Sequence, residues 1–209
     1  MTTRHTKRWL LSALAGGLLA TVPCTAAHAT TIVSLEHDVV GSTHIAAPDS
    51  DVALGPTTLH SDLDVDTGDF TASLPLPGTT SEFALAGFIP VKAHVDFVPA
   101  APVQGHLDFV GSDIKVTSTA QYYVKLSDIK IAGFPTFTGP NCRTVDPVTI
   151  PANTPADGVF DLINGGELEG TYSIGDFQNC GLNTWLINAV VPGDDNTLDL
   201  QVSNGRILD

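Results

Sequence analysis

The chain has 209 residues, of which nine are Lys or Arg and 23 are Asp or Glu, giving a formal charge of −14. Three of the basic residues and none of the acidic residues lie in residues 1–29, so the remaining 180 residues carry a formal charge of −17. A field of this sign repels nucleic acid and anionic membranes and disfavours polyanionic substrates, so we expect no nucleic-acid partner. A length of 180 residues is enough for one domain with a sizeable core.

Residues 1–29 have the composition of a cleaved signal peptide. A positively charged start is followed by an apolar stretch from Trp9 to Val22 and by the small residues Ala27-His28-Ala29, which signal peptidase recognises. The apolar stretch is shorter than the roughly 20 residues that span a bilayer, so we expect no membrane span. We predict cleavage before Thr30, a single β-rich domain over 30–209, and a location that is secreted, extracellular or in the cell envelope.

Residues 57–76 show a clear strand pattern. Apolar residues alternate with His and Asp from Leu59 to Asp66, and the alternation resumes from Phe70 to Leu76 after Thr67-Gly68. A period of two on both sides of a Gly-containing turn predicts a β-hairpin with one face on a core.

The Asp residues of this segment, Asp62-x-Asp64-x-Asp66, resemble the start of a calcium loop. The sixth and twelfth positions lack the Gly and Glu that an EF-hand needs, so the match fails. A looser calcium site between strands, with Asp66 and Asp69, stays open as an alternative to solvated strand residues.

A second hairpin is predicted over 89–97 and 103–109, with 98–102 as its loop. Both segments alternate apolar and polar residues, and a five-residue loop is within the usual range. In the simplest register Phe97 lies opposite Val103.

That register brings two histidines together. His94 would face His106, and Lys92 would face Asp108 as an opposite-charge pair. Opposed Cβ atoms lie about 5 Å apart, close enough for two imidazoles to share a metal ion. We therefore take His94 and His106 as candidate ligands of a divalent metal such as zinc, the only cofactor that the sequence suggests. The alternative is that both are solvated strand residues.

Further alternating segments cover 114–131, 168–174 and 198–202, whereas 182–191 has apolar residues at helical spacing. The helical stripe comprises Leu182, Trp185, Leu186, Ala189 and Val190. Many short strands with Gly or Pro turns and one core predict an all-β fold, a single antiparallel β-sandwich with at most one short helix near 182–191. A β-barrel is the alternative.

Three cysteines occur, and Cys24 lies in the signal segment. A lipid-anchored form cut before Cys24 is a further alternative, although Pro23 is unfavourable there. Cys142 and Cys180 are the pair left in the exported chain, where nothing keeps thiols reduced. We predict one disulfide between them, stabilising the fold by about 3–4 kcal/mol.

No motif of the sequence assigns a catalytic residue. There is no Gly-x-Ser-x-Gly elbow, no His-Glu-x-x-His and no phosphate-binding Gly loop. The leading hypothesis is therefore an exported, non-enzymatic binding protein or cell-surface component. The first alternative is an extracellular carrier of a small apolar ligand in a barrel or opened sandwich, and a carboxylate-dependent envelope hydrolase ranks last. The partners that fit are a protein, the cell envelope or a small apolar ligand, and the oligomeric state stays open.

Overall fold

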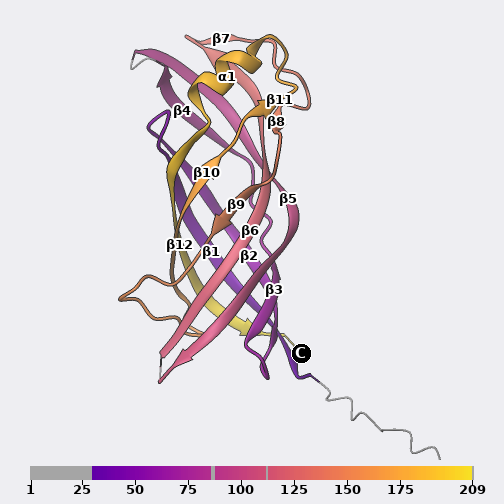
Figure 1. Ribbon diagram of the computed structural model, residues 1–209, viewed down its shortest axis with the longest axis vertical. Coiled ribbons are helices and arrows are strands. Elements are labelled where there is room, and N and C mark those ends of the chain that lie inside the picture. Colours follow the sequence, from indigo (N-terminus) through magenta and orange to yellow (C-terminus); the bar gives the residue numbers. More distant parts are fainter. Residues whose placement is uncertain (1–29, 86–87, 112, 209) are drawn as a thin grey trace, which may run out of the picture.

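A computed structural model describes residues 30–85, 88–111 and 113–208, so the predicted signal peptide and Cys24 lie outside the described residues. Long antiparallel strands run along the long axis of the molecule, and a short helix lies at one end (Figure 1). The strands are β1 (Ile32–Ile45), β2 (Ser50–Asp64), β3 (Asp69–Ser73), β4 (Thr79–Leu85), β5 (Ile89–Val110), β6 (Asp113–Ile131), β7 (Phe134–Pro135), β8 (Arg143–Thr144), β9 (Val148–Pro151), β10 (Gly166–Ile174), β11 (Phe177–Gln178) and β12 (Gly193–Ile207). The helices are a 3₁₀ turn, η1 (Gly181–Asn183), and α1 (Thr184–Val190).

The strands form one antiparallel sheet with the order β10-β12-β1-β2-β3-β5-β6-β8-β11, with β4 paired to β5 and both β7 and β9 paired to β6. The sheet curls, and β12, β1 and β2 face β5 and β6 across one apolar core, as the layers of a sandwich do. Between β9 and β10, an isolated bridge joins Asn153 to Glu169. Over the described residues the hydrogen-bonded path does not close into a barrel, and the predicted all-β, sandwich-like fold is confirmed.

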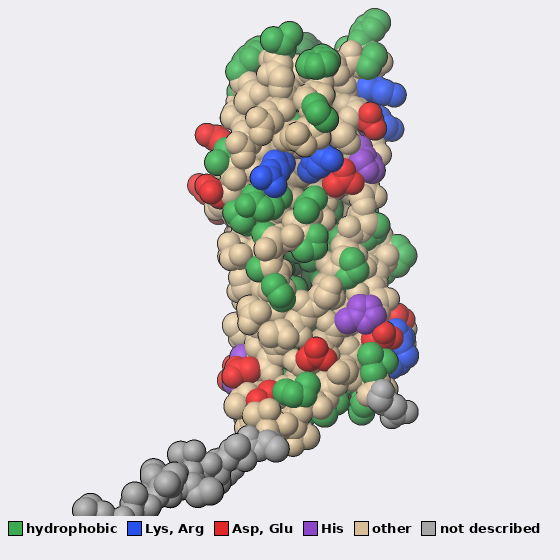
Figure 2. Space-filling view, turned by 90° about the vertical axis from the view of Figure 1, so that its right-hand side faces the viewer, with side chains coloured by type: hydrophobic (Ala, Val, Ile, Leu, Met, Phe, Trp, Pro, Cys, Tyr) green, Lys and Arg blue, Asp and Glu red, His purple; other side chains and the backbone are tan. Residues whose placement is uncertain are grey.

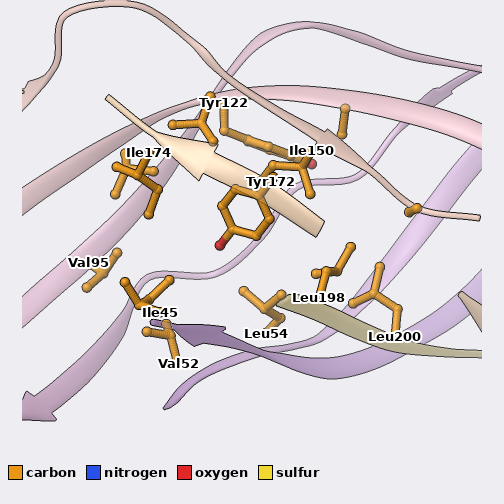
Figure 3. Close-up of a cluster of buried hydrophobic side chains, with 14 of the residues drawn as sticks. Ile45, Val52, Leu54, Val95, Tyr122, Ile150, Tyr172, Ile174, Leu198 and Leu200 are labelled. Atoms are coloured by element: carbon orange, nitrogen blue, oxygen red, sulfur yellow. The ribbon is translucent and has the colours of Figure 1, made fainter. Parts of the chain in front are cut away.

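The period of two places side chains on two faces of the sheet. In β1 every second residue from Leu35 to Val39 and from Thr43 to Ile45 is buried, and the residues between them are more exposed. Figure 3 shows side chains from several strands meeting in the core, with the Tyr172 ring of β10 in their midst. The core is continuous from one end of the sheet to the other.

The first predicted hairpin is confirmed, and the second is wrong. β2 and β3 pair around the turn at 65–68, with Leu63 opposite Phe70. In contrast, β5 continues through 98–102, because the two prolines there fall where the β5–β6 register shifts. A bulge does not need the backbone N–H that proline lacks, so a long strand accommodates both prolines without turning.

The predicted helix is present, but a different face is buried. Ile187 is the buried residue of α1, whereas Leu182 is 82 % and Trp185 73 % exposed. Leu182 belongs to η1, whose three residues per turn shift the following positions relative to an α-helical count. The inward face consequently runs through Asn183, Leu186, Ile187 and Val190.

The predicted disulfide is confirmed. Cys142 and Cys180 are bonded across a separation of 38 residues, and both are fully buried. The bond joins the segment before β8 to the segment that leads into η1 and α1. The disulfide therefore ties α1 to the end of the sheet that α1 covers.

Candidate functional site

The core contains an apolar cavity of about 90 Å³, which we call the lower cavity. Its wall is built from both layers of the sheet, because inward positions of β1, β2, β5, β6, β10 and β12 all contribute. Among the lining residues are Leu35, Leu54, Leu63, Val116, Leu168 and Leu200. Nearly all of the lining surface is hydrophobic.

A second apolar cavity of about 80 Å³, the upper cavity, lies at the end of the core that α1 covers. Its lining includes Val52, Val91, Val124, Ile187 and Val190. The helix closes this cavity with its inward face, so the position of α1 decides whether the upper cavity is sealed.

Thr43, Phe97 and Tyr172 line both cavities and form the partition between them. The Thr43 hydroxyl donates to the carbonyl of Thr197 at 2.7 Å and therefore accepts the hydrogen bond of the Tyr172 hydroxyl at 2.6 Å. Burial raises the pKa of Tyr172, and the bond to Thr43 partly offsets this shift. The partition is thus neutral and its polar atoms are satisfied.

Tyr122 forms another part of the lower cavity wall. Its hydroxyl donates to the carbonyl of Leu74 at 2.6 Å, and its ring lies edge-on to Phe97 with centroids 6.4 Å apart. Burial raises the pKa of Tyr122 to about 12. The neighbouring Tyr123 points to the opposite face, where the Arg143 guanidinium stacks 4.2 Å from its ring centroid.

His37 is a polar residue of the lower cavity wall that was not predicted from the sequence. It occupies an inward position of β1 and is 3 % exposed. Its Nε2 lies 2.9 Å from the carbonyl oxygen of Leu162, while its Nδ1 has no hydrogen-bond partner among the described residues. The signal was available, because the period of two through Leu35 and Val39 places residue 37 on the inward face.

The structure does not bring the predicted metal ligands together. His94 and His106 lie on the same strand, 12 residues and so about 40 Å apart. His94 is opposite Thr80 and Ser127, so the predicted pairing of the two histidines is wrong, as is that of Lys92 with Asp108. The cause is the continuity of β5, which removes the turn that the pairing required.

Each of the two histidines has a carboxylate neighbour instead. His94 Nε2 lies 3.3 Å from Asp96, and His106 Nδ1 lies 2.8 Å from Asp69. The hydrogen bond to His106 lowers the pKa of Asp69. Asp66, the other residue of the calcium alternative, accepts the backbone N–H of Thr31. Across the described ranges no group of three or more His, Cys, Asp or Glu side chains is arranged to hold a metal ion.

Bulky hydrophobic side chains are exposed at the end of the molecule that carries α1. We call this set the end patch; it comprises Phe88, Phe134, Phe137, Leu182 and Trp185, each more than 70 % exposed. Figure 2 shows hydrophobic side chains gathered at this end, and Figure 1 places β7 and α1 there. Side-chain hydrogen bonds from Asn183 to Thr136 and to the Phe137 carbonyl hold the loop against the helix.

The fold and its cavities define an all-β protein with a partly hollow apolar core. No family model, no curated protein and no solved structure matches the chain. Among the described residues, no helix has both the length and the apolar character needed to cross a membrane.

Proposed function

We propose that this is an exported, non-enzymatic protein that binds a small apolar molecule in the lower cavity. The observation that carries the proposal is an interior space of about 90 Å³ whose lining is almost entirely hydrophobic. An engineered apolar cavity of about 150 Å³ binds benzene. The lower cavity is smaller, so a ligand of that size must displace wall side chains or extend into the upper cavity of about 80 Å³. A tightly packed core would contain few voids of this size.

A break in the wall supports a route to the cavity. The ladder of β5 with β3 ends at Ala72, and its ladder with β4 begins at Thr79, so residues 74–78 make no ladder with β5. Leu74 and Leu76 belong to this segment, line the lower cavity and are partly exposed. A molecule that passes between these side chains breaks no ladder bond, whereas crossing a paired part of the sheet would break backbone hydrogen bonds.

The test is titration of the mature protein with toluene, followed by calorimetry, with a matched pair of cavity-filling variants. Ala120 lines the lower cavity and Ala93 lines the upper one, and both lie on strands where valine is favoured. We expect Ala120→Val to weaken toluene binding at least several-fold and Ala93→Val to leave it unchanged. No saturable binding by the wild type, or loss of binding in Ala93→Val alone, would contradict the proposal. A small apolar molecule retained in native mass spectrometry of the exported protein would support it.

The end patch favours a second candidate, attachment to the surface of a membrane in the cell envelope. Exposed aromatic residues suit the interface of a bilayer, and Lys130 lies directly beside the patch because β6 and β7 pair there. Lys92 is opposite Lys130 in the register but is paired with Glu82, so Lys130 supplies the positive charge at this end of an otherwise acidic protein. Anionic headgroups are complementary to that combination.

Sedimentation with phosphatidylglycerol vesicles tests this attachment. We expect the wild type to sediment with the vesicles and the double variant Phe134→Ser, Trp185→Ser to stay in solution. Phe109→Ser is the control, because Phe109 is also exposed but lies near the other end of β5. Equal sedimentation of the three proteins would contradict a role for the end patch.

A further inference from the structure

The surroundings of His37 indicate which polar group a ligand of the lower cavity would carry, and the volume of the cavity does not. The imidazole sits on β1 among apolar neighbours, with its ring centroid 6.0 Å from that of Phe160. Burying a polar group in such surroundings is costly unless it is hydrogen-bonded. Only half of the imidazole is satisfied by the protein.

The contacts of the ring decide which nitrogen carries the proton. A carbonyl oxygen accepts hydrogen bonds and cannot donate them, so the 2.9 Å contact between Nε2 and Leu162 requires an N–H at Nε2. Nδ1 of the neutral ring then presents a lone pair. On the Nε2 side the ring also meets the backbone, since a Cβ added at Gly205 would lie 2.8 Å from Nε2. This packing holds the ring with Nδ1 as its free acceptor.

The other polar side chains deepest in the wall have partners. Ser118 donates to the Ala152 carbonyl, Tyr122 to the Leu74 carbonyl, and the hydroxyls of Tyr172 and Thr43 bond to each other. Among the described residues, the buried side-chain atoms without a partner are His37 Nδ1 and Thr138 Oγ1, and Thr138 does not line the cavity. Nδ1 itself has almost no accessible surface, so a ligand hydroxyl reaches it when a neighbouring side chain of the wall moves.

Resting on the proposed function, we infer that the ligand of the lower cavity is a small alcohol or phenol whose hydroxyl donates a hydrogen bond to His37 Nδ1. Such a molecule uses a single polar contact and places its hydrocarbon part against the leucines and valines of the wall. A purely apolar ligand leaves the acceptor unpaired. A carboxylate offers no donor when it is ionised, and it would bring a charge into an apolar space.

The experiment compares phenol with toluene, which differ by a hydroxyl in place of a methyl group, on the wild type and two variants. We expect the ratio of phenol to toluene affinity, measured by calorimetry, to fall about tenfold in His37→Phe. Leu35→Met is the matched control, because it changes an inward residue of the same strand without adding or removing a polar group, and we expect its ratio to equal that of the wild type. An unchanged ratio in His37→Phe overturns the assignment of His37 while leaving apolar binding intact. Failure of the wild type to bind either probe overturns both proposals.

A measurement on the wild type keeps the inference testable if His37→Phe does not fold. Acceptance of a hydrogen bond moves the nitrogen-15 resonance of an unprotonated imidazole nitrogen upfield. We expect phenol to move the His37 Nδ1 resonance in this direction and toluene to leave it in place. Equal responses to the two probes at saturation would contradict the inference.

Discussion

The lower and upper cavities have similar volumes, about 90 and about 80 Å³, but their polar atoms are arranged differently. In the upper cavity the buried hydroxyls of Ser50 and Ser81 bond to each other at 2.8 Å, and those of Thr43 and Tyr172 are paired as well. In the lower cavity His37 Nδ1 is left without a partner. The two cavities therefore differ as binding sites although their volumes are similar. An unpaired buried acceptor costs free energy that a ligand with a donor can recover, whereas a hydroxyl pair that is already satisfied gains no hydrogen bond from a ligand.

The cover of the two cavities differs as well. The upper cavity is closed by α1, which the Cys142–Cys180 bond and the side chain of Asn188 fasten to the sheet. The lower cavity is lined mainly by the sheet, with Phe160 and Leu162 from the segment between β9 and β10, and the ladder is interrupted at 74–78. A change to the helix end should thus affect the upper cavity first.

The largest effect is expected from removing the disulfide. For a separation of 38 residues, Cys142→Ser with Cys180→Ser should lower the free energy of unfolding by about 4 kcal/mol. Urea unfolding measures the total, and hydrogen exchange under native conditions locates it. We expect amides of α1 to lose more protection than those of β1, and a uniform loss over both would show that the bond does not act mainly on the helix end.

The next largest effect concerns the partition. Phe97→Ala removes a ring that lines both cavities and should cost about 3 kcal/mol, since the neighbours can collapse only in part. The variant should also accept larger apolar probes than toluene, because the two spaces then merge. Phe109→Ala is the control, because that ring is 64 % exposed and its loss should cost less than about 0.5 kcal/mol. A small cost at Phe97 with no change in probe size would mean that Thr43 and Tyr172 suffice as the partition.

Much of the fold could be predicted from the sequence, because it depends on local patterns. The alternation in β2 and β3 predicts the first hairpin, and the helical spacing over 182–190 predicts the helix but not its buried residue, Ile187. Cys142 and Cys180 are the two cysteines outside the predicted signal peptide, which is enough to predict their bond. Each of these conclusions needs only short-range periodicity or simple counting.

The rest depends on partners that are distant in the sequence. Pro99 and Pro102 can either turn the chain or lie at bulges within a strand, and the pairing of β5 with β6 selects the bulges. The pairing of His94 with His106 required the turn, so it does not form. The importance of His37 likewise depends on the carbonyl of Leu162, which is 125 residues away. The period of two places His37 inside the sheet, but it does not indicate which of its nitrogens will be satisfied.

A further prediction tests the lower cavity wall at alkaline pH. The folded pKa of Tyr122 is about 12 against an ordinary value of 10.0, because burial disfavours the phenolate. The stability that depends on this group is fully present below pH 10 and is lost as the pH rises through 12. The urea midpoint should fall over this range, and less steeply in Tyr122→Phe. Equal slopes in the two proteins would show that other groups control the alkaline transition.

The smallest effect is expected at the hydroxyl pair of the upper cavity. Ser50 also donates to the Glu82 carbonyl at 3.3 Å, so Ser81 is the donor within the pair. Ser81→Ala should cost about 1 kcal/mol. The double variant with Ser50→Ala should cost less than the sum of the single variants, since the second substitution removes a group that the first left partly unpaired.

The same variants sharpen the contrast between the cavities when they are titrated with phenol and toluene. Ser50 and Ser81 are predicted to have a purely structural role, so the ratio of the two affinities should be that of the wild type in the double variant. A tenfold lower ratio of phenol to toluene affinity in the double variant would mean that phenol binds in the upper cavity. The unpaired nitrogen of His37 would then not determine where the ligand lies. An unchanged ratio, together with its loss in His37→Phe, would place the polar recognition in the lower cavity.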